Sequence, residues 1–407
     1  MFNLCLLIVF CIFAVHLKKQ MSEAKFIHYD LKLVAPSFSA QLTDLIIELD
    51  YLRKKQLSGS THEKVFFQLK EIFHMLESIG SARIEGNNTT IAEYIETKID
   101  TKSTNENVPF GIKEIQNIEK SMTFIEDNIK EYPINRLFIS ELHKMIVDGL
   151  KTPPDGEGDR TPGEYRQTNI KINQSKHQPP EWLRVNDYMQ ELFDFISVED
   201  SPKYDLLKVA IAHHRFVWVH PFGNGNGRTV RLFTYAMLVK TGFNVDLGRI
   251  INPTAVFCNN RNDYYSYLAE ADKGTDEGIL IWIEYVLKGL KEEIEKIDKL
   301  LDYNFLKKEI LLPAISYSLE RKYITPNETE ILKKIIEKQL IQAADLKEFF
   351  VGKTDSEISR QIRKLIDKKM IMPESEGTRK YIIRFDNNYL LRGIIKALGE
   401  KGFLPIQ

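Results

Sequence analysis

The stretch His220-Pro221-Phe222-Gly223-Asn224-Gly225-Asn226-Gly227-Arg228-Thr229-Val230-Arg231 lies near the middle of the chain. An apolar segment with helical periodicity, residues 206–217, precedes it and predicts a buried helix. A second predicted helix runs from Arg228 to Lys240 and is closed by Gly242. Three glycines at alternate positions lead into that second helix. Free N–H groups and the positive end of a helix dipole suit an anion there, especially phosphate.

Charged and titratable side chains add chemistry to this turn. Arg228 and Arg231 are three residues apart in the second predicted helix, so both reach the same side. His220, at the entrance of the turn, takes a proton near neutral pH. A phosphate cradle, two cations and a base within a dozen residues predict a phosphoryl- or nucleotidyl-transfer site.

This stretch also has simpler interpretations. Many Gly-rich loops are only turns, and a loop that follows a helix does not fit the dinucleotide fingerprint. No Gly-x-x-x-x-Gly-Lys-Ser/Thr loop occurs in the chain. A metal site formed by His213, His214 and His220 has no cysteine or carboxylate at a supporting spacing. We therefore expect His213 and His214 to be packed helix residues with satisfied ring nitrogens.

The twelve residues resemble the signature of the Fic (filamentation induced by cAMP) family, His-Pro-Phe-x-acid-Gly-Asn-Gly-Arg-x-x-Arg. The resemblance implies a mainly α fold with a helical core and a small β-hairpin flap. It also implies an enzyme that moves AMP from ATP onto a hydroxyl side chain of a target protein. In that scheme His220 is the base, and the loop amides of residues 225–227 hold the phosphates with Asn226 and Arg228. The residues placed at the nucleotide in this part of the chain are Gly225, Asn226, Gly227, Arg228 and Arg231, the last at the γ-phosphate.

One position departs from the signature. The family has an acidic residue where this chain has Asn224, and in the family that residue binds the magnesium bridging the phosphates. An asparagine carbonyl can bind magnesium but has no charge, so we expect lower metal affinity.

A second motif lies in the N-terminal part of the chain, at Ser81-Ala82-Arg83-Ile84-Glu85-Gly86. Gly86 predicts a helix end, and a carboxylate at Glu85 would face the negative end of that helix dipole unless a cation elsewhere answers it. A solvated glutamate beside a turn is the simpler interpretation. The resemblance instead implies the inhibitory motif of Fic proteins, in the class with an N-terminal inhibitory helix. Glu85, with Ser81, would then pair with Arg231 and block the γ-phosphate, or position water for removal of AMP.

Two further segments are candidates for substrate contacts. Residues 169–173 alternate polar and apolar side chains, which predicts a short strand. The resemblance makes this strand part of the flap, where Ile170 and Ile172 would register a target segment, although spacing alone fits an ordinary surface hairpin. It also makes Asn262, Tyr264 and Tyr265 nucleotide contacts. For Tyr264, packing of the ring against the core is an equally good interpretation.

The C-terminal part begins with a capping box and proline at Thr325-Pro326-Asn327-Glu328. Three predicted helices, ending in one that starts at residues 355–356, precede a strand at residues 380–384. This pattern resembles a winged-helix module, whose third helix commonly enters the major groove of DNA. Such modules also bind proteins or form homodimers, so DNA is one of two alternatives here.

Composition and length set the remaining expectations. With 407 residues and 43% hydrophobic content the chain can form two or three domains. We predict a doubtful extension at 1–20, an inhibitory helical region at 21–104, a catalytic core at 105–300, and a linker helix with the winged-helix domain at 301–407. A net charge of −1 gives no general attraction to nucleic acid or membrane.

Three cysteines, two of them within the first dozen residues, support no disulfide framework and indicate a reducing cytoplasm. Residues 2–17 are mostly apolar and short for a spanning helix. A membrane anchor is therefore the alternative, and translation starting at Met21 is the interpretation we favour.

These observations predict an autoinhibited protein adenylyltransferase that uses ATP and a weakly held Mg²⁺. The alternatives are a nucleotide-sensing, DNA-binding regulator with little transferase activity, and an enzyme that removes AMP from modified proteins.

Overall fold

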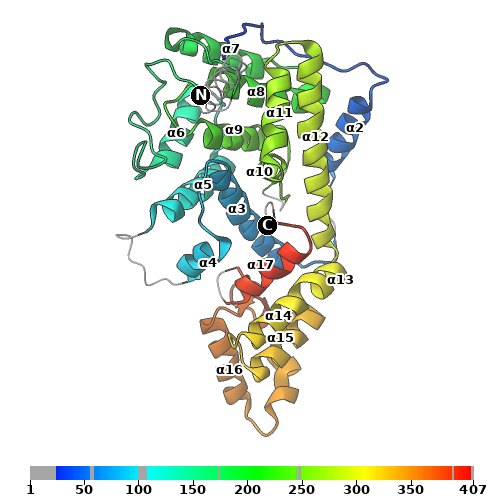
Figure 1. Ribbon diagram of the computed structural model, residues 1–407. Helices are drawn as coiled ribbons and strands as arrows, with labels where there is room; N and C mark the ends of the chain where they lie inside the picture. The colour runs from blue at the N-terminus through cyan, green and yellow to red at the C-terminus, as the bar shows by residue number, and fades with distance from the viewer. Residues whose placement is uncertain are drawn as a thin grey trace, which may run out of the picture.

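The computed structural model describes residues 24–55, 59–99, 108–172, 175–243, 245, 249–386 and 389–404. Helices make up most of it, which confirms the predicted mainly α fold. Figure 1 shows an elongated molecule, one end of which is formed by the segment coloured yellow to orange. The helices up to residue 298 are α2 Gln41–Lys54, α3 Glu63–Ile84, α4 Ile91–Ile99, α5 Phe110–Asn128, α6 Arg136–Val147, α7 Val185–Ser197, α8 Asp205–Val219, α9 Asn226–Lys240, α10 Pro253–Cys258, α11 Arg261–Ala271 and α12 Asp276–Asp298.

Helices α8 and α9 form the centre of the larger part. The predicted pair is confirmed, with α9 beginning two residues earlier than expected and Gly242 following it at φ 108°. Both helices are buried over nearly their whole length, because α5, α6 and α10 pack on α9 while α7 and α12 pack on α8. A helix with apolar residues on every face is stable only in such an environment. The turn between them is therefore held by rigid elements on both sides.

Helix α3 connects the two parts of the molecule. It is 22 residues long and buried along most of its length. Near its start, the Gln68 side chain donates to the carbonyl of Ile383 (3.0 Å) and accepts from the N–H of Phe385 (2.8 Å) in the C-terminal part. Its last residue, Ile84, lies about 24 Å further along the axis at 1.5 Å per residue. In Figure 1, α3 accordingly runs from α9 down to α17, Leu390–Glu400.

The C-terminal part combines short helices with a small antiparallel sheet in the order β1-β3-β2. The capping box is present: Thr325 Oγ1 accepts from the N–H of Glu328, whose carboxylate accepts from the N–H of Thr325. The elements are α13 Tyr303–Phe305, α14 Leu312–Glu320, α15 Pro326–Lys338, β1 Ile341–Gln342, a 3₁₀ segment Ala343–Phe350, α16 Asp355–Asp367, β2 Ile371–Pro373, β3 Lys380–Ile383 and α17 Leu390–Glu400. This order agrees with the predicted pattern, and the assignment to the winged-helix class stays a prediction.

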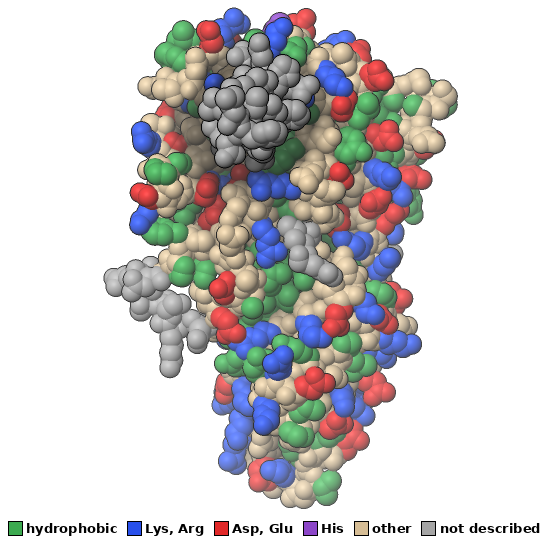
Figure 2. Space-filling view, viewed as in Figure 1, with side chains coloured by type: hydrophobic (Ala, Val, Ile, Leu, Met, Phe, Trp, Pro, Cys, Tyr) green, Lys and Arg blue, Asp and Glu red, His purple; other side chains and the backbone are tan. Residues whose placement is uncertain are grey.

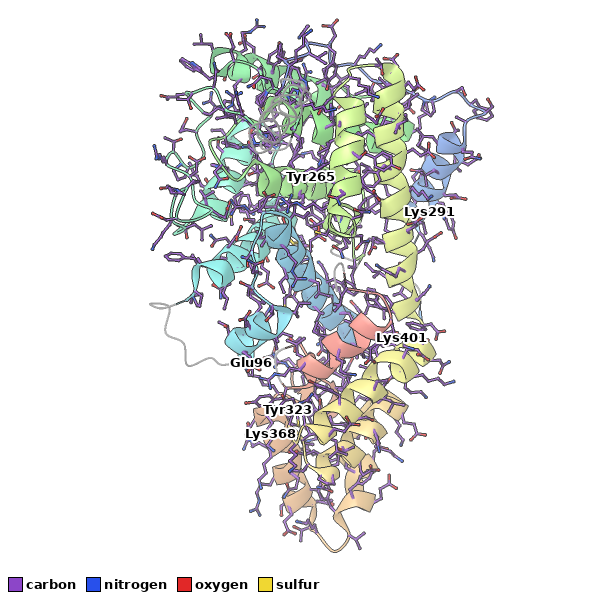
Figure 3. The ribbon with its side chains drawn as sticks, in the orientation of Figure 1. Glu96, Tyr265, Lys291, Tyr323, Lys368 and Lys401 are labelled. Atoms are coloured by element: carbon purple, nitrogen blue, oxygen red, sulfur yellow. The ribbon has the colours of Figure 1, made fainter. Side chains whose placement is uncertain are left out.

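Helix α16 has one apolar and one basic face. Ile358, Ile362 and Leu365 are buried. The basic side chains on the other face are exposed at Arg360, Arg363, Lys364 and Lys368, and half-buried at Lys369. Figure 2 shows Lys and Arg side chains along the edge of the molecule where Figure 1 draws α16, and Figure 3 labels Lys368 there.

A close contact between α14 and α17 gives the first testable prediction. A Cβ at Gly393 of α17 would lie 2.4 Å from the carbonyl oxygen of Ala314, and backbone cannot move aside as a side chain can. Gly393→Ala is therefore expected to lower the free energy of unfolding of this part by about 1–3 kcal/mol, measured by hydrogen exchange in α14 and α17. Gly399→Ala in the same helix is the control, since its Cβ would meet only the end of the Leu404 side chain.

Several predictions fall outside the described residues. The apolar run 2–17, the alternative start at Met21, Cys5, Cys11 and Asn173 belong to this group. In the part of the chain that the structure describes, none of the helices is both long enough and apolar enough to cross a membrane. The domain boundaries stay predictions.

Candidate active site

His220 occupies the position where α8 ends. Its backbone is left-handed (φ 51°, ψ 63°), so the chain turns sharply after Val219 and the imidazole leaves the helix axis. The N–H of His220 still bonds to the carbonyl of Phe216 (3.0 Å), and Arg166 Nε donates to its carbonyl oxygen (2.9 Å). A residue with a Cβ adopts this conformation only when its surroundings impose it. The backbone of His220 is thus held by α8 and by Arg166, in the segment that precedes the predicted flap.

The protonation of His220 suits a base. Its Nδ1 lies 3.3 Å from the carbonyl oxygen of Val217, which can only accept, so a proton on Nδ1 leaves Nε2 with a free lone pair. Burial lowers the pKa of His220 to about 4, and the positive charge of Arg166 acts in the same direction. At neutral pH the imidazole is therefore uncharged and able to accept a proton.

Asn226 fixes the shape of the Gly-rich turn. Its Oδ1 accepts from the N–H of Phe222 and its Nδ2 donates to the carbonyl oxygen of the same residue, both at 2.9 Å. Gly225, with φ 76°, precedes the first residue of α9. Both ends of the Asn226 side-chain amide are thus bonded within the turn, and its predicted contact with phosphate stays a prediction.

Glu85 and Arg231 form the ion pair that the family resemblance implied. Arg231 Nη2 donates to Glu85 Oε1 (2.7 Å) and to the carbonyl oxygen of Ser81 (2.9 Å), and its Nε donates to Ser81 Oγ (2.8 Å). A Cβ at Gly227 would lie only 2.1 Å from Glu85 Oε1, so glycine is needed for the carboxylate to approach. The carboxylate therefore lies against the first turn of α9, where helix N–H groups favour an anion.

The charge of Glu85 follows from this position. Burial alone would raise its pKa, but the opposing charges of Arg231 and Arg228 outweigh burial and leave the pKa below its usual range. Glu85 is thus a carboxylate at neutral pH. It occupies a site whose donors and positive charge also fit a phosphate group.

The surroundings of Arg228 were not foreseen from the sequence. Its guanidinium is buried, with Nη1 on Glu114 Oε1 (2.8 Å) and Nη2 on the carbonyl oxygen of Glu157 (2.6 Å). Asn87 Nδ2 also donates to Glu114 (2.7 Å). Glu114 lies in α5 and no local motif marks it, so sequence reasoning missed it. The predicted contact of Arg228 with phosphates stays a prediction that requires it to exchange these partners.

Asn224, the residue that departs from the family signature, contacts the loop at residues 153–162, which is rich in proline and glycine and precedes the predicted flap. Its backbone N–H donates to Asp159 Oδ2 (2.7 Å), and its Nδ2 donates to the carbonyl oxygen of Gly158 (3.2 Å) and to Glu157 Oε2 (3.3 Å). Among the described residues, no three or more His, Cys, Asp or Glu side chains are grouped to hold a metal ion. A cation here would need oxygen atoms from the nucleotide as well.

The predicted nucleotide contacts on α11 divide into two groups. The ring of Tyr264 is buried against Phe257, and its OH lies 3.0 Å from Nε2 of His213, so the core-packing interpretation fits this residue. Tyr265 is 42% exposed and Asn262 is exposed too. Figure 3 labels Tyr265 at α11, beside α9. These two residues are free to meet a ligand, whereas Tyr264 is not.

His213 and His214 are packed residues, as expected. His213 Nδ1 lies 2.7 Å from Thr234 Oγ1, and both ring nitrogens of His214 have partners, in the Tyr29 OH (3.0 Å) and Asp272 Oδ1 (2.9 Å).

The predicted strand in the flap is wrong for the described residues. Residues 169–172 form no ladder, and the carbonyl of Ile170 accepts instead from the Gln178 side chain (2.7 Å). The returning segment at residues 176–178 pairs with Lys25 near the N-terminus in a parallel bridge, which takes the backbone groups that a hairpin would use. Ile170 and Ile172 are half-buried.

Comparison with known proteins shows what this chain is similar to. Residues 133–238 match the model of the Fic/DOC family. A protein adenylyltransferase Fic from Culex quinquefasciatus is 27% identical over 287 residues, which cover 64% of this chain and 52% of that protein. One from Nematostella vectensis is 28% identical over 220 residues, 52% of this chain and 44% of that protein. The crystal structure of a Fic family protein from Desulfovibrio desulfuricans covers 88% of this chain and 98% of its own with a TM-score of 0.53, at 19% identity.

The overall fold is similar to that of a solved Fic family protein. Residues 133–238, which include the turn at His220, match the Fic/DOC family model. The chain spans about half the length, or less, of the curated relatives it matches. The family match begins at residue 133, so neither Glu85 nor the C-terminal part lies within it.

Proposed function

We propose that this chain is a protein adenylyltransferase that is inhibited by its own Glu85. The observation that carries the proposal is the Glu85 carboxylate, held by Arg231 at the N-terminus of α9, at the turn that begins with His220. A phosphate of ATP would meet the same guanidinium and the same helix N–H groups, so nucleotide and Glu85 compete for one place.

The chemistry follows from the uncharged imidazole. Nε2 of His220 takes the proton of a target hydroxyl, whose oxygen then forms a bond to the α-phosphorus of ATP. The bond from that phosphorus to the bridging oxygen breaks, and pyrophosphate leaves with the electron pair. The first turn of α9 and Arg231 hold the phosphates in line for this displacement. Asn262 and Tyr265 are the exposed side chains that would contact the adenine ring of ATP.

Magnesium fits the donors present at Asn224. Its amide oxygen is a hard donor, and among the described residues it accepts no hydrogen bond. When bound, the ion would neutralise charge on the phosphates of ATP and of the leaving pyrophosphate. The role of this chain is to place an oxygen donor beside the turn that holds the phosphates.

The position of the label in ATP tests the reaction directly. We expect the full chain to acquire radioactivity from ATP labelled at the α-phosphate and none from ATP labelled at the γ-phosphate. Mass spectrometry of the product should show the added mass of AMP on a Ser, Thr or Tyr side chain. Label from the γ-phosphate alone would contradict AMP transfer and indicate a kinase.

The basic face of α16 favours a second candidate, a regulator that binds DNA and responds to nucleotide. Its exposed Arg and Lys side chains would meet phosphates of the backbone. In that case the apparent affinity for duplex DNA would fall steeply as salt increases. Removal of AMP from a modified target, with Glu85 positioning water, is the third candidate, and incubation with an AMP-modified peptide distinguishes it from transfer.

A further inference from the structure

The missing acid of the family signature has a counterpart elsewhere in the chain. Position 224 carries an uncharged amide, but the carboxylate of Glu157 lies beside it, with Oε2 at 3.3 Å from Asn224 Nδ2. The two residues are 67 positions apart, so no motif joins them. The fold thus places the negative charge of Glu157 beside position 224, where the sequence has no acid.

Glu157 is held firmly through its backbone. Its carbonyl oxygen accepts from Arg228 Nη2 (2.6 Å), and the next carbonyl, of Gly158, accepts from Asn224 Nδ2 (3.2 Å). Gly158 is fixed in turn, because its N–H donates to the carbonyl oxygen of Lys151 (2.7 Å) and a Cβ at Gly158 would lie 2.4 Å from the carbonyl oxygen of Leu150. Residues 157 and 158 are therefore attached both to the Gly-rich turn and to the segment that follows α6, at residues 150–151.

The carboxylate itself remains accessible. The Glu157 side chain is 41% exposed and reaches Arg228 Nη2 at 3.4 Å, a long ion pair. The neighbouring acid, Asp159, is 4% exposed and its two oxygens already bond to the N–H groups of Asn224 (2.7 Å) and Thr161 (2.8 Å). Of these two acids, Asp159 shapes the loop, and Glu157 has an oxygen to offer a ligand.

We propose that Glu157 supplies the charged oxygen ligand for the divalent cation that accompanies the nucleotide, while Asn224 supplies a neutral one. The proposal rests on the proposed function, because it needs a nucleotide at the turn. One carboxylate together with phosphate oxygens is the usual way in which proteins hold Mg²⁺. Phosphates bound at the turn would attract the Arg228 guanidinium away from Glu157. The Glu157 carboxylate would then be free to bind the cation.

The test measures metal binding and not turnover. All variants carry Glu85→Gly and are loaded with an ATP analogue whose α,β-bridge is a methylene, so that no AMP is transferred. Mn²⁺ is titrated and free Mn²⁺ is followed by its EPR signal. Glu157→Gln is expected to weaken Mn²⁺ binding about tenfold or more, and adding Asn224→Asp should restore it. Without metal, in EDTA, the Glu85→Gly chain and the chain that also carries Glu157→Gln should bind the analogue with the same affinity.

Glu164→Gln is the matched control. This exposed residue lies in the same loop and loses the same charge, but it faces Arg136 at 3.6 Å. Equal weakening in Glu157→Gln and Glu164→Gln would overturn the proposal, as would Mn²⁺ binding unchanged in Glu157→Gln. Loss of analogue binding in EDTA would also overturn it, because Glu157 would then act through Arg228. If the Glu85→Gly chain binds no analogue at all, the proposed function falls together with this inference.

Discussion

His220→Ala, introduced into the Glu85→Gly chain, is expected to reduce AMP transfer by a factor of about 10² to 10⁴, the usual contribution of a general base. The reason is that Nε2 is the uncharged acceptor at the turn, while the phosphate-binding groups of α9 stay in place. Affinity for ATP, measured by calorimetry, should change little. A variant that keeps most of its transfer rate would show that another group removes the proton.

The backbone at this position calls for a second variant. Because His220 adopts φ 51°, alanine there could distort the turn, whereas asparagine tolerates the left-handed region. His220→Asn should lose transfer to the same extent with an unchanged melting temperature. A difference between the two variants would indicate that the backbone, and not the imidazole, limits the rate.

The pH dependence of AMP transfer tests the role of His220 as a base, because a histidine that only packs against its neighbours would not produce it. Since burial and Arg166 lower the pKa of His220 to about 4, the base is already deprotonated at neutral pH and is protonated only as pH falls through that value. Transfer by the Glu85→Gly chain should therefore be nearly constant from pH 7 down to about 5 and be lost near 4. A midpoint near 6.5 would mean that the imidazole is as accessible to water as a free histidine.

The second large effect is expected from Glu85→Gly. Removing the carboxylate frees Arg231 and the first turn of α9, so transfer of AMP from α-labelled ATP should rise by about tenfold or more over the unmodified chain. The rate is measured as label incorporated into the chain or a target protein. An unchanged rate would show that the contact between Glu85 and Arg231 is structural and not inhibitory.

Two other variants distinguish the contribution of the Glu85 charge from that of the volume its side chain occupies. Glu85→Gln keeps the bulk and removes the charge, so it should give an intermediate rate. Ser81→Ala removes one hydrogen bond to Arg231 Nε and leaves the ion pair, so it should raise the rate only slightly. ATP should stabilise the Glu85→Gly chain more than the unmodified one, because phosphate replaces the lost partner of a buried guanidinium.

Much of the site was predictable because it is local in the chain. The burial of α8, the turn after His220 and the helix that follows depend on periodicity and glycine spacing within about 35 residues, and the structure confirms each. The pairing of Glu85 with Arg231 was predictable only through the family resemblance, since the two residues are 146 positions apart. The strand predicted at residues 169–173 is wrong for the described residues 169–172, because alternation of side chains does not specify a hydrogen-bonding partner.

The sequence by itself determined where a histidine, a glycine turn and two arginines follow one another, because local backbone preferences act over neighbouring residues. Only the tertiary structure decided which polar side chains meet: the charges of Arg228 and Glu114, and the uncharged amide of Asn224 with the carboxylate of Glu157. These pairs join separate helices and loops, and a charged side chain accepts any partner of opposite sign that packing brings within reach. Helical spacing shows which face of an element is buried, but the packing of the elements against one another decides what lies opposite.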